Sequence, residues 1–450
     1  MKPSGDQHSS ISPARIGAFD ILMRVEEQDA YASELLHSPR YQSLSPADHR
    51  LATELVMGVL RWRSRLDDEI SGKSSQSLAK LDLEVLTTLR MGAYQLRYLD
   101  RIPTHAAIHE AVELVKRARK ASAGGFVNAV LRKIATAPAQ SRLQAPDSAE
   151  DLARQYAHPE WLVQRWIDEY GLESATRICE YDQENPAATI RLRNESAERA
   201  LQEAGIQLAP GALLASARRV QSGDVTHTAS FRSGQIAIQD EGSQLVALLV
   251  GRGARILDCC CAPGGKTSVL AERNPGAQLL ATEIYPQRAR LARRLIREPN
   301  VRIVAADARQ LPLTSFFDRV LVDVPCSGTG TIARNPEIKW QLKPEDLSDL
   351  TARQTAILTA AMDRVEPGGK LIYSSCSLGR EENAGVVERA SQARPDFRLT
   401  KIMEELQALR DEGELVWPDL ESLTSGPYLH TLPGVHPCDG FFAAILERKH

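Results

Sequence analysis

Apolar residues in the first third of the chain recur at helical spacing. In the stretch "LDLEVLTTLRMGAYQLRYL", Leu83, Leu86, Leu89, Ala93 and Leu96 are three or four residues apart and share one face of a helix. "THAAIHEAVELVKRAR" and "GGFVNAVLRKI" follow as further helices, and no strand-like alternation interrupts them. The pattern predicts a helical bundle of about 120 residues.

Short apolar runs alternate with amphipathic segments in the C-terminal half. The runs that predict strands are "ARILD", "QLLATEI", "VRIVAAD", "DRVLVD", "GKLIYSS" and "GFFAAILER", and helices are predicted between them, for example "YPQRARLARRLIRE" and "LSDLTARQTAILTAAMDRV". This alternation with short connections is typical of an α/β fold with a doubly wound, mostly parallel sheet. Such sheets bind ligands beyond the carboxyl ends of their strands.

A polar segment rich in proline, alanine and serine, "ATAPAQSRLQAPDSAED", separates the two regions. After it, "HPEWLVQRWIDEYG" predicts an amphipathic helix, and "AATIRLRN", "ESAERALQEAG" and "GQIAIQDEG" predict a small strand–helix–strand unit. We therefore predict five segments: a flexible N-terminal arm (1–13), an all-α domain (14–138), a linker (139–150), a helix with a small α+β subdomain (151–245) and an α/β domain (246–450).

Composition narrows the class of protein. The chain has 450 residues and a formal net charge of −3, so a nucleic-acid partner would have to be bound by local basic patches. No run approaches about 18 apolar residues and the N-terminus has no signal-peptide core, so we expect neither a membrane span nor secretion. The seven cysteines are an odd number, three of them are adjacent, and no Cys-x-x-Cys pair occurs; we expect a cytoplasmic protein without a metal site.

Acidic residues end four successive predicted strands. Asp258, Glu283, Asp307 and Asp323 would therefore meet at one edge of the sheet. A tight turn at residues 263–265 follows the first strand, and its spacing matches neither a phosphate-binding loop nor a dinucleotide fingerprint. An acidic residue about 20 positions past such glycines is where ribose hydroxyls are bound. The concentrated negative charge predicts a ligand with a positive centre and hydroxyls, which S-adenosylmethionine satisfies better than a polyanionic nucleotide.

Two cysteines follow neighbouring predicted strands, in "VDVPCSGTG" and "LIYSSCSLG". Cys326 and Cys376 lie in polar loops at the ligand edge, which favours a chemical role over packing. Lys266, or the helix start near Arg380, would lower the pKa of a nearby thiol. A thiolate that adds to carbon 6 of a pyrimidine makes carbon 5 able to accept a methyl group, after which a base removes the carbon 5 proton. These residues alone do not rank the two thiols.

Together the motifs resemble the Sun (Fmu) family of RNA cytosine-5 methyltransferases. "DCCCAPGGKT", "DVPCSGTG", "RNPEIKW", "YSSCS" and "DGFFAAIL" occur in the family's order, over about residues 155–448. The N-terminal "THAAIHEAVELVKR" and "GFVNAVLRKI" resemble the NusB-like RNA-binding domain. The resemblance implies a Rossmann-like, S-adenosylmethionine-dependent methyltransferase domain behind an all-α NusB-like domain. It also implies an enzyme that forms 5-methylcytosine in 16S ribosomal RNA, in an unassembled or partly assembled small subunit, through a covalent cysteine–pyrimidine adduct.

Carried over residue by residue, the resemblance implies a cofactor site. The loop that would bind S-adenosylmethionine contains Cys260, Cys261, Ala262, Pro263, Gly264, Gly265 and Lys266. Glu283 would hold the ribose, Asp307 would lie by the adenine and Asp323 would lie between the cofactor and the target base. Glu283 stands where aspartate is commoner in the family.

The resemblance also ranks the thiols. Cys376 would be the nucleophile and Cys326 would assist release of the methylated product, with Asp323 and Lys266 completing the catalytic set. The target cytosine has to be unstacked, so a flipped base or a single-stranded loop is expected.

Local basic residues are expected to contact RNA. The alternative for each is that it is simply a solvated surface residue. The residues are Lys116, Arg117, Arg119, Lys120, Arg132, Lys133, Arg191, Arg193, Arg334 and Lys339. Because Arg334 and Lys339 flank the loop of Cys326, an RNA-binding role is favoured for these two. Trp340 either stacks on a base or packs into a core.

Two other functions stay open at this point. The same chemistry could act on transfer RNA or another RNA, and the fold could serve as a non-catalytic RNA-binding factor in ribosome assembly. DNA is a weaker alternative, because DNA cytosine methyltransferases resemble this chain in a Pro-Cys nucleophile but lack the second cysteine at a strand end.

Overall fold

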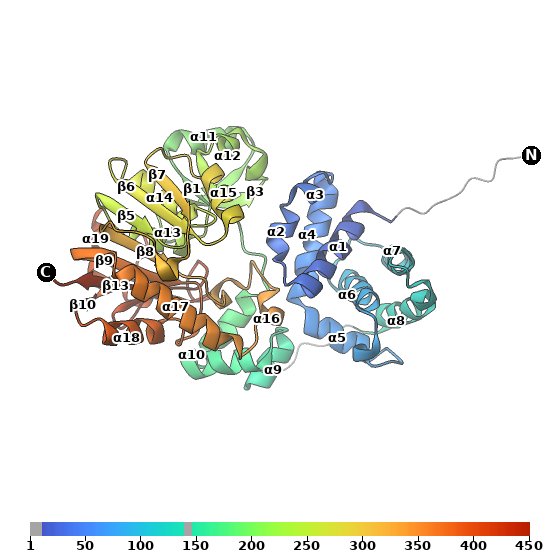
Figure 1. Cartoon of the computed structure of the whole chain (residues 1–450). Helices are drawn as coiled ribbons and strands as arrows, with labels where there is room; N and C mark the ends of the chain where they lie inside the picture. Colours follow the sequence, from blue (N-terminus) through green and yellow to red (C-terminus); the bar gives the residue numbers. More distant parts are fainter. Residues whose placement is uncertain (1–10, 139–145) are drawn as a thin grey trace, which may run out of the picture. The chain divides into compact units, whose positions relative to one another are not determined.

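The computed structural model describes residues 11–138 and 146–450 (Figure 1). The predicted arm and linker fall mostly on residues 1–10 and 139–145, which lie outside the described residues. The described chain forms two compact units. One comprises the residues up to Glu184 together with Ile332–Gln341, and the other comprises Asn185–Thr331 and Leu342–His450. The chain therefore leaves the second unit after Thr331 and returns to it at Leu342.

The first unit is helical, as the spacing of apolar residues predicts. Its α-helices are α1 (Pro13–Gln28), α2 (Ala32–Leu36), α3 (Pro39–Gln42), α4 (Pro46–Arg61), α5 (Arg63–Ser71), α6 (Leu83–Tyr98), α7 (Thr104–Arg117), α8 (Gly124–Thr136), α9 (Ala149–Gln155), α10 (Glu160–Tyr181) and α16 (Ile338–Gln341). Helix α4 begins as its sequence dictates: Pro46 occupies the first turn, and the Ser45 hydroxyl accepts the Asp48 amide at 3.1 Å. Of the apolar face predicted for α6, Leu89 and Ala93 are fully enclosed in the core, and the other three residues are half-buried.

The segment Ile332–Gln341, which contains the motif "RNPEIKW", is built into this helical unit. Glu337 is buried and accepts the amide of Ala32 at 2.8 Å. The buried Lys339 ammonium donates to the carbonyl of Arg61 at 2.9 Å. These contacts hold a stretch of the C-terminal half of the sequence among helices from the first seventy residues.

The RNA contact predicted for Lys339 is wrong. Its side chain is 1% exposed, because the ammonium points into the helical unit instead of toward solvent. For Trp340 the packing alternative holds: the indole N–H donates to the Leu60 carbonyl at 2.6 Å, and the Arg63 guanidinium lies 5.5 Å from the ring centre. The contact predicted for Arg334 stays a prediction.

The second unit opens with a small antiparallel sheet. Its elements are β1 (Thr189–Leu192), α11 (Glu195–Glu203), β2 (Gln207–Pro210), β3 (Ala217–Ser222), α12 (Ala229–Arg232) and β4 (Ile236–Ile238), and the strand order is β2-β3-β1-β4. Ile190, Leu201 and Ile236 form part of its core. The predicted strands β1 and β4 and helix α11 are confirmed. Strands β2 and β3 were not predicted, because "ARRVQS" in β3 is mostly polar.

The large sheet carries the predicted α/β alternation (Figure 1). Its strands are β5 (Arg255–Asp258), β6 (Gln278–Glu283), β7 (Val301–Ala305), β8 (Phe317–Asp323), β9 (Val365–Ser375), β10 (Phe397–Thr400), β11 (Thr424–Ser425), β12 (Tyr428–Thr431) and β13 (Phe441–Arg448). The order is β11-β12-β13-β9-β8-β5-β6-β7, with β10 beside β13. The five strands from β9 to β7 are parallel, which confirms the Rossmann-like fold, whereas β10 to β13 add an antiparallel side.

Helices cover both faces of this sheet. They are α13 (Glu241–Leu248), α14 (Gly265–Arg273), α15 (Pro286–Leu295), α17 (Asp346–Met362), α18 (Ala384–Ala393) and α19 (Ile402–Asp411). Successive strand residues belong to different cores: Ile256 packs with α13, α14 and α19, whereas Leu257 packs with α17 and α18. Alternate residues of each strand are therefore buried on opposite faces, as expected for a doubly wound sheet with helices on both sides.

The RNA contacts predicted for Arg191 and Arg193 are also corrected. Arg191 lies in β1 and Arg193 follows its end, and both side chains ion-pair with Glu272 of α14. Arg193 also pairs with Glu298 at 2.8 Å. Their guanidinium groups fasten the small sheet to the large one and are engaged by carboxylates within the same unit.

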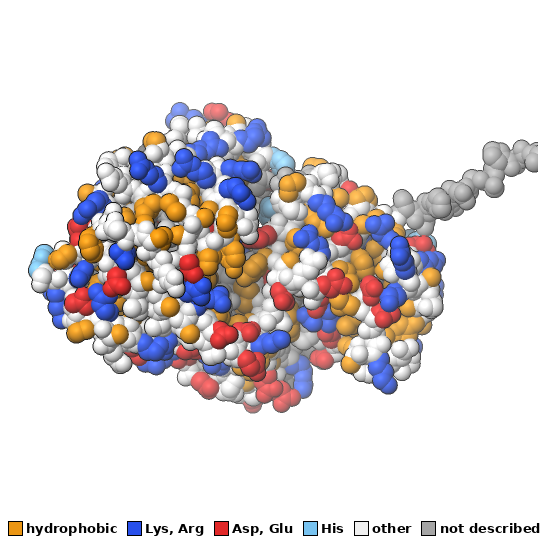
Figure 2. Space-filling model, viewed as in Figure 1, with side chains coloured by type: hydrophobic (Ala, Val, Ile, Leu, Met, Phe, Trp, Pro, Cys, Tyr) orange, Lys and Arg blue, Asp and Glu red, His pale blue; other side chains and the backbone are white. Residues whose placement is uncertain are grey.

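The surface of the described residues carries both signs of charge. Figure 2 shows Lys and Arg side chains and Asp and Glu side chains over the visible face, with hydrophobic side chains between them. Among the described residues, no helix has the length and apolar character needed to cross a membrane.

Lys339 predicts a pH dependence of stability. Burial lowers its pKa to about 7, and Asp182 opposes part of this effect. An unfolded lysine titrates near 10.5, so between these values the unfolded chain binds more protons and the free energy of unfolding rises with pH. We expect Lys339→Met to remove part of the rise in thermal midpoint that the full-length protein shows between pH 7 and pH 9.

The exposed Lys401 supplies the control, since Lys401→Met should keep the wild-type rise. An identical pH dependence in the Lys339→Met and wild-type proteins would mean that the buried amine does not contribute to it.

Candidate functional site

The four predicted carboxylates lie along one edge of the large sheet. Asp323 ends β8, Asp258 ends β5, Glu283 ends β6 and Asp307 follows β7, and these strands are neighbours in that order. The strands are parallel, so their carboxyl ends point the same way. The structure therefore brings together the acidic residues that the sequence placed at separate strand ends.

Asp258 organises the turn that follows β5. One carboxylate oxygen accepts the Thr267 hydroxyl at 2.7 Å and the other accepts the Cys260 amide at 3.3 Å. Burial raises the pKa of Asp258 to about 6, although the hydrogen bond from Thr267 opposes the shift. Both oxygens are used by the loop itself, which identifies Asp258 as a support of the turn.

The glycine turn brings backbone to the strand edge. Gly264 has φ 118°, a conformation open to glycine, and a Cβ there would lie 2.9 Å from Ile296. Gly265 begins α14, so the first amides of this nine-residue helix are at the same edge. Pro263 is exposed and Ala262 is half-buried in the turn. The turn therefore presents main-chain groups where a ligand would bind.

The three adjacent cysteines have different surroundings. Cys259 and Cys261 are buried in the cores on opposite faces of the sheet, and burial raises the pKa of both thiols. Cys260 is half-buried. The Cys261 sulfur is committed to packing, so its predicted cofactor contact would have to involve the main chain.

Glu283 and Asp307 are held by local hydrogen bonds. Glu283 is 5% exposed, and one of its oxygens accepts the Tyr285 amide at 3.0 Å. Asp307 accepts the amide and the guanidinium of Arg309, and these hydrogen bonds lower the pKa of Asp307. These hydrogen bonds orient both carboxylates at the edge, and their predicted ribose and adenine contacts stay predictions.

Lys266 and Asp323 form an ion pair beside the thiols. The Lys266 ammonium donates to Asp323 Oδ2 at 2.8 Å, and the Ser374 hydroxyl donates to Oδ1 at 2.7 Å. The ammonium also lies 5.1 Å from the centre of the Phe441 ring. Burial by itself would lower the pKa of Lys266, but Asp323 and Cys376 outweigh it and the pKa is raised. Lys266 therefore stays an ammonium at neutral pH.

The two thiols face each other across adjacent parallel strands. Cys326 follows β8, Cys376 follows β9, and their sulfur atoms are 3.3 Å apart. The hydrogen bond to Cys376, together with burial, raises the pKa of the Cys326 thiol well above its ordinary value. Cys326 therefore keeps its proton at neutral pH, and one of the two thiols donates a hydrogen bond to the other. The Lys266 ammonium also interacts electrostatically with Cys376.

Glu382 joins the two thiol-bearing loops. Its buried carboxylate accepts the amide of Ser327 at 2.8 Å and the hydroxyls of Ser327 and Ser377 at 2.5 Å each. The Gln354 amide also donates to it at 2.9 Å. Each serine directly follows one of the two cysteines in sequence. The analysis of the sequence missed Glu382; the serine after each cysteine was the available sign of a shared acceptor.

A main-chain contact closes the same site. The Gly330 amide donates to the Cys376 carbonyl at 2.8 Å, and the Gly440 amide donates to the Gly330 carbonyl at 2.7 Å. A Cβ at Gly330 would lie 2.3 Å from the Gly440 carbonyl oxygen, so only glycine permits this approach. The motifs "CSGTG", "SSCS" and "DGFF" therefore meet because their backbones touch.

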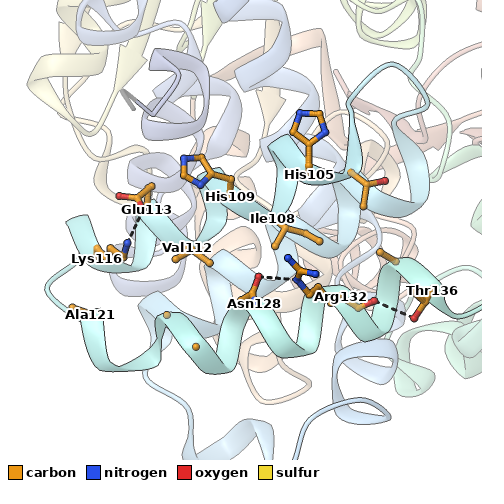
Figure 3. A pocket seen from close by; sticks show the side chains of 14 residues that line it. His105, Ile108, His109, Val112, Glu113, Lys116, Ala121, Asn128, Arg132 and Thr136 are labelled. Atoms are coloured by element: carbon orange, nitrogen blue, oxygen red, sulfur yellow. Dashed lines mark hydrogen bonds and ion pairs between the residues drawn. The ribbon is translucent and has the colours of Figure 1, made fainter. Parts of the chain in front are cut away.

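A separate groove lies between α7 and α8 of the helical unit (Figure 3). It has a volume of about 850 Å³, and predicted RNA-binding residues Lys116 and Arg132 line it. Lys116 pairs with Glu113 at 2.7 Å, and Arg132 donates to Asn128 at 3.2 Å. The basic residues of the helical unit thus border a concave surface, and their contact with RNA stays a prediction.

The donor set at the sheet edge fits S-adenosylmethionine. Three carboxylates face one edge, a glycine turn brings main-chain amides to it, and Lys266 and Arg309 pair with Asp323 and Asp307. Carboxylates suit ribose hydroxyls and cationic groups, whereas a polyphosphate would be repelled. No cluster of three or more His, Cys, Asp or Glu side chains suited to a metal occurs in the described part of the chain. Fold and site together define an S-adenosylmethionine-dependent methyltransferase.

Comparisons with known proteins specify the family. The family described as "16S rRNA methyltransferase RsmB/F" matches residues 246–447, the NusB family matches residues 12–136, and the RsmF/B-like ferredoxin-like domain matches residues 158–226. The "Probable ribosomal RNA small subunit methyltransferase B" of Bacillus subtilis is 34% identical over 448 residues, covering 96% of this chain and 98% of the relative. The "Ribosomal RNA small subunit methyltransferase B" of Vibrio cholerae is 32% identical, covering 98% of each chain.

Solved structures support the fold. The crystal structure of PH0851 has a TM-score of 0.79 at 22% identity and covers 98% of this chain and 99% of its own. A methyltransferase homologue from Pyrococcus horikoshii has a TM-score of 0.55 at 25% identity and covers 68% of this chain and all of its own. The chain belongs to the RsmB/F family of 16S rRNA methyltransferases and carries a NusB-like N-terminal region.

Removal of Glu382 should destabilise the catalytic unit. Glu382→Ala leaves several buried donors without their acceptor, at about 1–3 kcal/mol for each. We expect the free energy of unfolding, measured by denaturant and circular dichroism, to fall by about 3 kcal/mol or more. Glu382→Gln should lose less, because it keeps one oxygen as an acceptor.

The exposed Glu388, which pairs with Arg380, provides the comparison. Glu388→Ala should change stability by no more than about 0.5 kcal/mol. Equal effects of the Glu382 and Glu388 substitutions would show that Glu382 does not hold the loops.

Proposed function

We propose that this enzyme transfers a methyl group to carbon 5 of a cytosine in 16S ribosomal RNA, with Cys376 as the nucleophile. The observation that carries the proposal is the pair of thiols 3.3 Å apart beside the Lys266–Asp323 ion pair. A single cysteine would be explained by packing. Two thiols at adjacent strand ends, with a buried ammonium at hand, suit addition to and elimination from a pyrimidine ring.

The proposed reaction begins with Cys376. Its thiolate adds to carbon 6, forming a C–S bond, and the electron pair of the carbon 5–carbon 6 double bond makes carbon 5 nucleophilic. S-adenosylmethionine supplies an electrophilic methyl group when it is bound. Removal of the carbon 5 proton by a base restores the double bond, and the C–S bond breaks to release Cys376 as a thiolate.

Cys326 is proposed as the group that assists this release. Its pKa is raised first by its hydrogen bond to Cys376 and second by burial. Once the Cys376 sulfur is bonded to carbon 6, it no longer accepts that hydrogen bond as a thiolate. Without that hydrogen bond the Cys326 thiol ionises more readily, and its thiolate form can accept a proton at the stage when one has to be removed.

Asp323 is proposed to contact the target base. Its carboxylate is oriented by Lys266 and Ser374 beside the thiols. An aspartate accepts a hydrogen bond from the exocyclic amino group of cytosine, which uracil lacks. The glycine turn at residues 264–265 and Glu283 would hold S-adenosylmethionine, through main-chain amides and the ribose hydroxyls respectively.

The ribosomal substrate is inferred from the relatives. The Bacillus subtilis and Vibrio cholerae proteins are named for the small-subunit ribosomal RNA, and they align over nearly the whole chain. The NusB-like region supports an RNA substrate, free or in a partly assembled small subunit. Bisulfite sequencing of ribosomal and transfer RNA, with and without the gene, would distinguish this substrate from another RNA.

Substitution of each thiol tests the assignment. Cys376→Ala should lower methyl transfer to 16S ribosomal RNA by roughly a thousandfold or more, because the nucleophile is lost. It should still be stabilised thermally by S-adenosylmethionine. Cys326→Ala should instead accumulate a protein–RNA adduct that migrates slowly in a denaturing gel.

Cys179→Ala, which changes a buried cysteine of the helical unit, should behave as wild type in both assays. Persisting activity in Cys376→Ala would refute the nucleophile. The absence of an adduct in Cys326→Ala would refute its role in release. If S-adenosylmethionine fails to stabilise the wild-type protein, the non-catalytic alternative is favoured.

A further inference from the structure

Helix α15 is an unusually basic element of an acidic chain. Six arginines and a single acidic residue, Glu298, occur between Pro286 and Arg302, whereas the whole chain carries a net charge of −3. Within α15 itself no acidic residue is present. Neither the thiols nor the carboxylate edge account for this charge.

The helix buries very little of its surface. Ala289 and Ala292 are its buried residues, so its packing face is narrow. Arg290 and Arg294 are one helical turn apart on the opposite face and both are exposed. Arg302 is exposed on β7, the last strand of the sheet order. The described residues provide no hydrogen-bond or ion-pair partner for these three guanidinium groups.

The acidic residue of this segment, Glu298, is already engaged. Glu298 pairs with Arg193 at 2.8 Å and accepts the Ser268 hydroxyl at 3.1 Å. Arg297 donates to the carbonyls of Arg232 and Ser233 at 2.6 Å, which fixes the end of this segment against the small sheet. Arg290, Arg294 and Arg302 are thus exposed on a segment whose end is held in place by Arg297.

A cleft and two exposed leucines lie next to these arginines. A cleft of about 180 Å³ at the end of α15 is lined by Arg293 and Arg297 among others. Leu291 and Leu295 are 45% and 54% exposed, next to Arg290 and Arg294 in sequence. Figure 2 shows Lys and Arg side chains gathered over the region of α12 and α15, with hydrophobic side chains beside them.

We propose that this surface, defined by Arg290, Arg294 and Arg302 with Leu291 and Leu295, binds the phosphate backbone of the RNA substrate outside the catalytic pocket. Unpaired guanidinium groups bind phosphates well, and exposed apolar side chains next to them can contact unstacked bases. The inference rests on the proposed function for the identity of the RNA. An acidic protein surface is negatively charged like RNA, but it has no unstacked bases for the exposed leucines beside the arginines to contact.

A triple variant tests the surface. Arg290→Ala, Arg294→Ala and Arg302→Ala are combined in the full-length protein. Binding to a 16S ribosomal RNA transcript is then measured over a range of salt concentrations from about 50 to about 300 mM. Loss of three contacts to single-stranded RNA should lower the salt slope of the logarithm of affinity by about 2 and weaken binding roughly 50-fold at about 150 mM salt. KM for the RNA should rise while kcat and stabilisation by S-adenosylmethionine stay unchanged.

The matched control is a variant in which three other exposed arginines, each paired with an acidic residue, are replaced. Arg154, Arg177 and Arg398 pair with Glu150, Glu173 and Glu447. Their combined substitution by alanine should leave RNA affinity and salt slope within about twofold of wild type. Equal behaviour of the two triple variants would overturn the proposal.

Two other results are decisive. If the α15 variant binds the transcript as wild type but loses binding to small-subunit particles that contain protein, the partner is a protein and the RNA proposal is wrong. If wild-type protein binds the transcript but transfers no methyl group to it or to native ribosomal RNA, the proposed function fails, and the binding comparison still decides the role of α15.

Discussion

The buried carboxylate of Glu382 determines the distance between the two thiols. Cys326 and Cys376 come from loops that are 50 residues apart in sequence, and neither loop has regular secondary structure at the cysteine. Adjacent parallel strands bring the loops near each other, but strand pairing alone leaves the side chains of the following residues unplaced. Hydrogen bonds from Ser327 and Ser377 to one carboxylate fix both loops at once. The facing position of the two sulfur atoms depends on this arrangement.

Much of the fold follows from local pattern. Helical spacing and alternating strand–helix order predict the helical unit and the parallel strands, because these periodicities are imposed by burial of one helix face and of both sheet faces. The short strands β10, β11 and β12 were missed. They have two to four residues each, too few to show a period, and tertiary contacts decide their pairing: β10 and β12 pair with β13, and β11 pairs with β12.

The site was predicted in its residue types and less well in its basic residues. The carboxylates, the glycine turn and the thiols stand at strand ends, where topology brings them together without further information. Lys339 and Arg191 were misjudged, because a charge in the sequence does not say which way its side chain points. The partner of Lys339 is 278 positions away, and that of Arg191 is 81 positions away. Both are satisfied inside the protein by groups that only the folded chain brings near.

The segment Ile332–Gln341 makes part of the C-terminal half of the sequence a structural component of the helical unit. It begins six residues after Cys326, yet its Glu337, Lys339 and Trp340 are hydrogen-bonded to the start of α2 and the end of α4. A domain that only delivered RNA would need no more than a flexible linker to the catalytic unit. Here the chain that leaves the Cys326 loop is buried among α2 and α4, and it returns to the second unit only at Leu342. The segment that follows the Cys326 loop therefore folds with residues that precede it by about 300 positions.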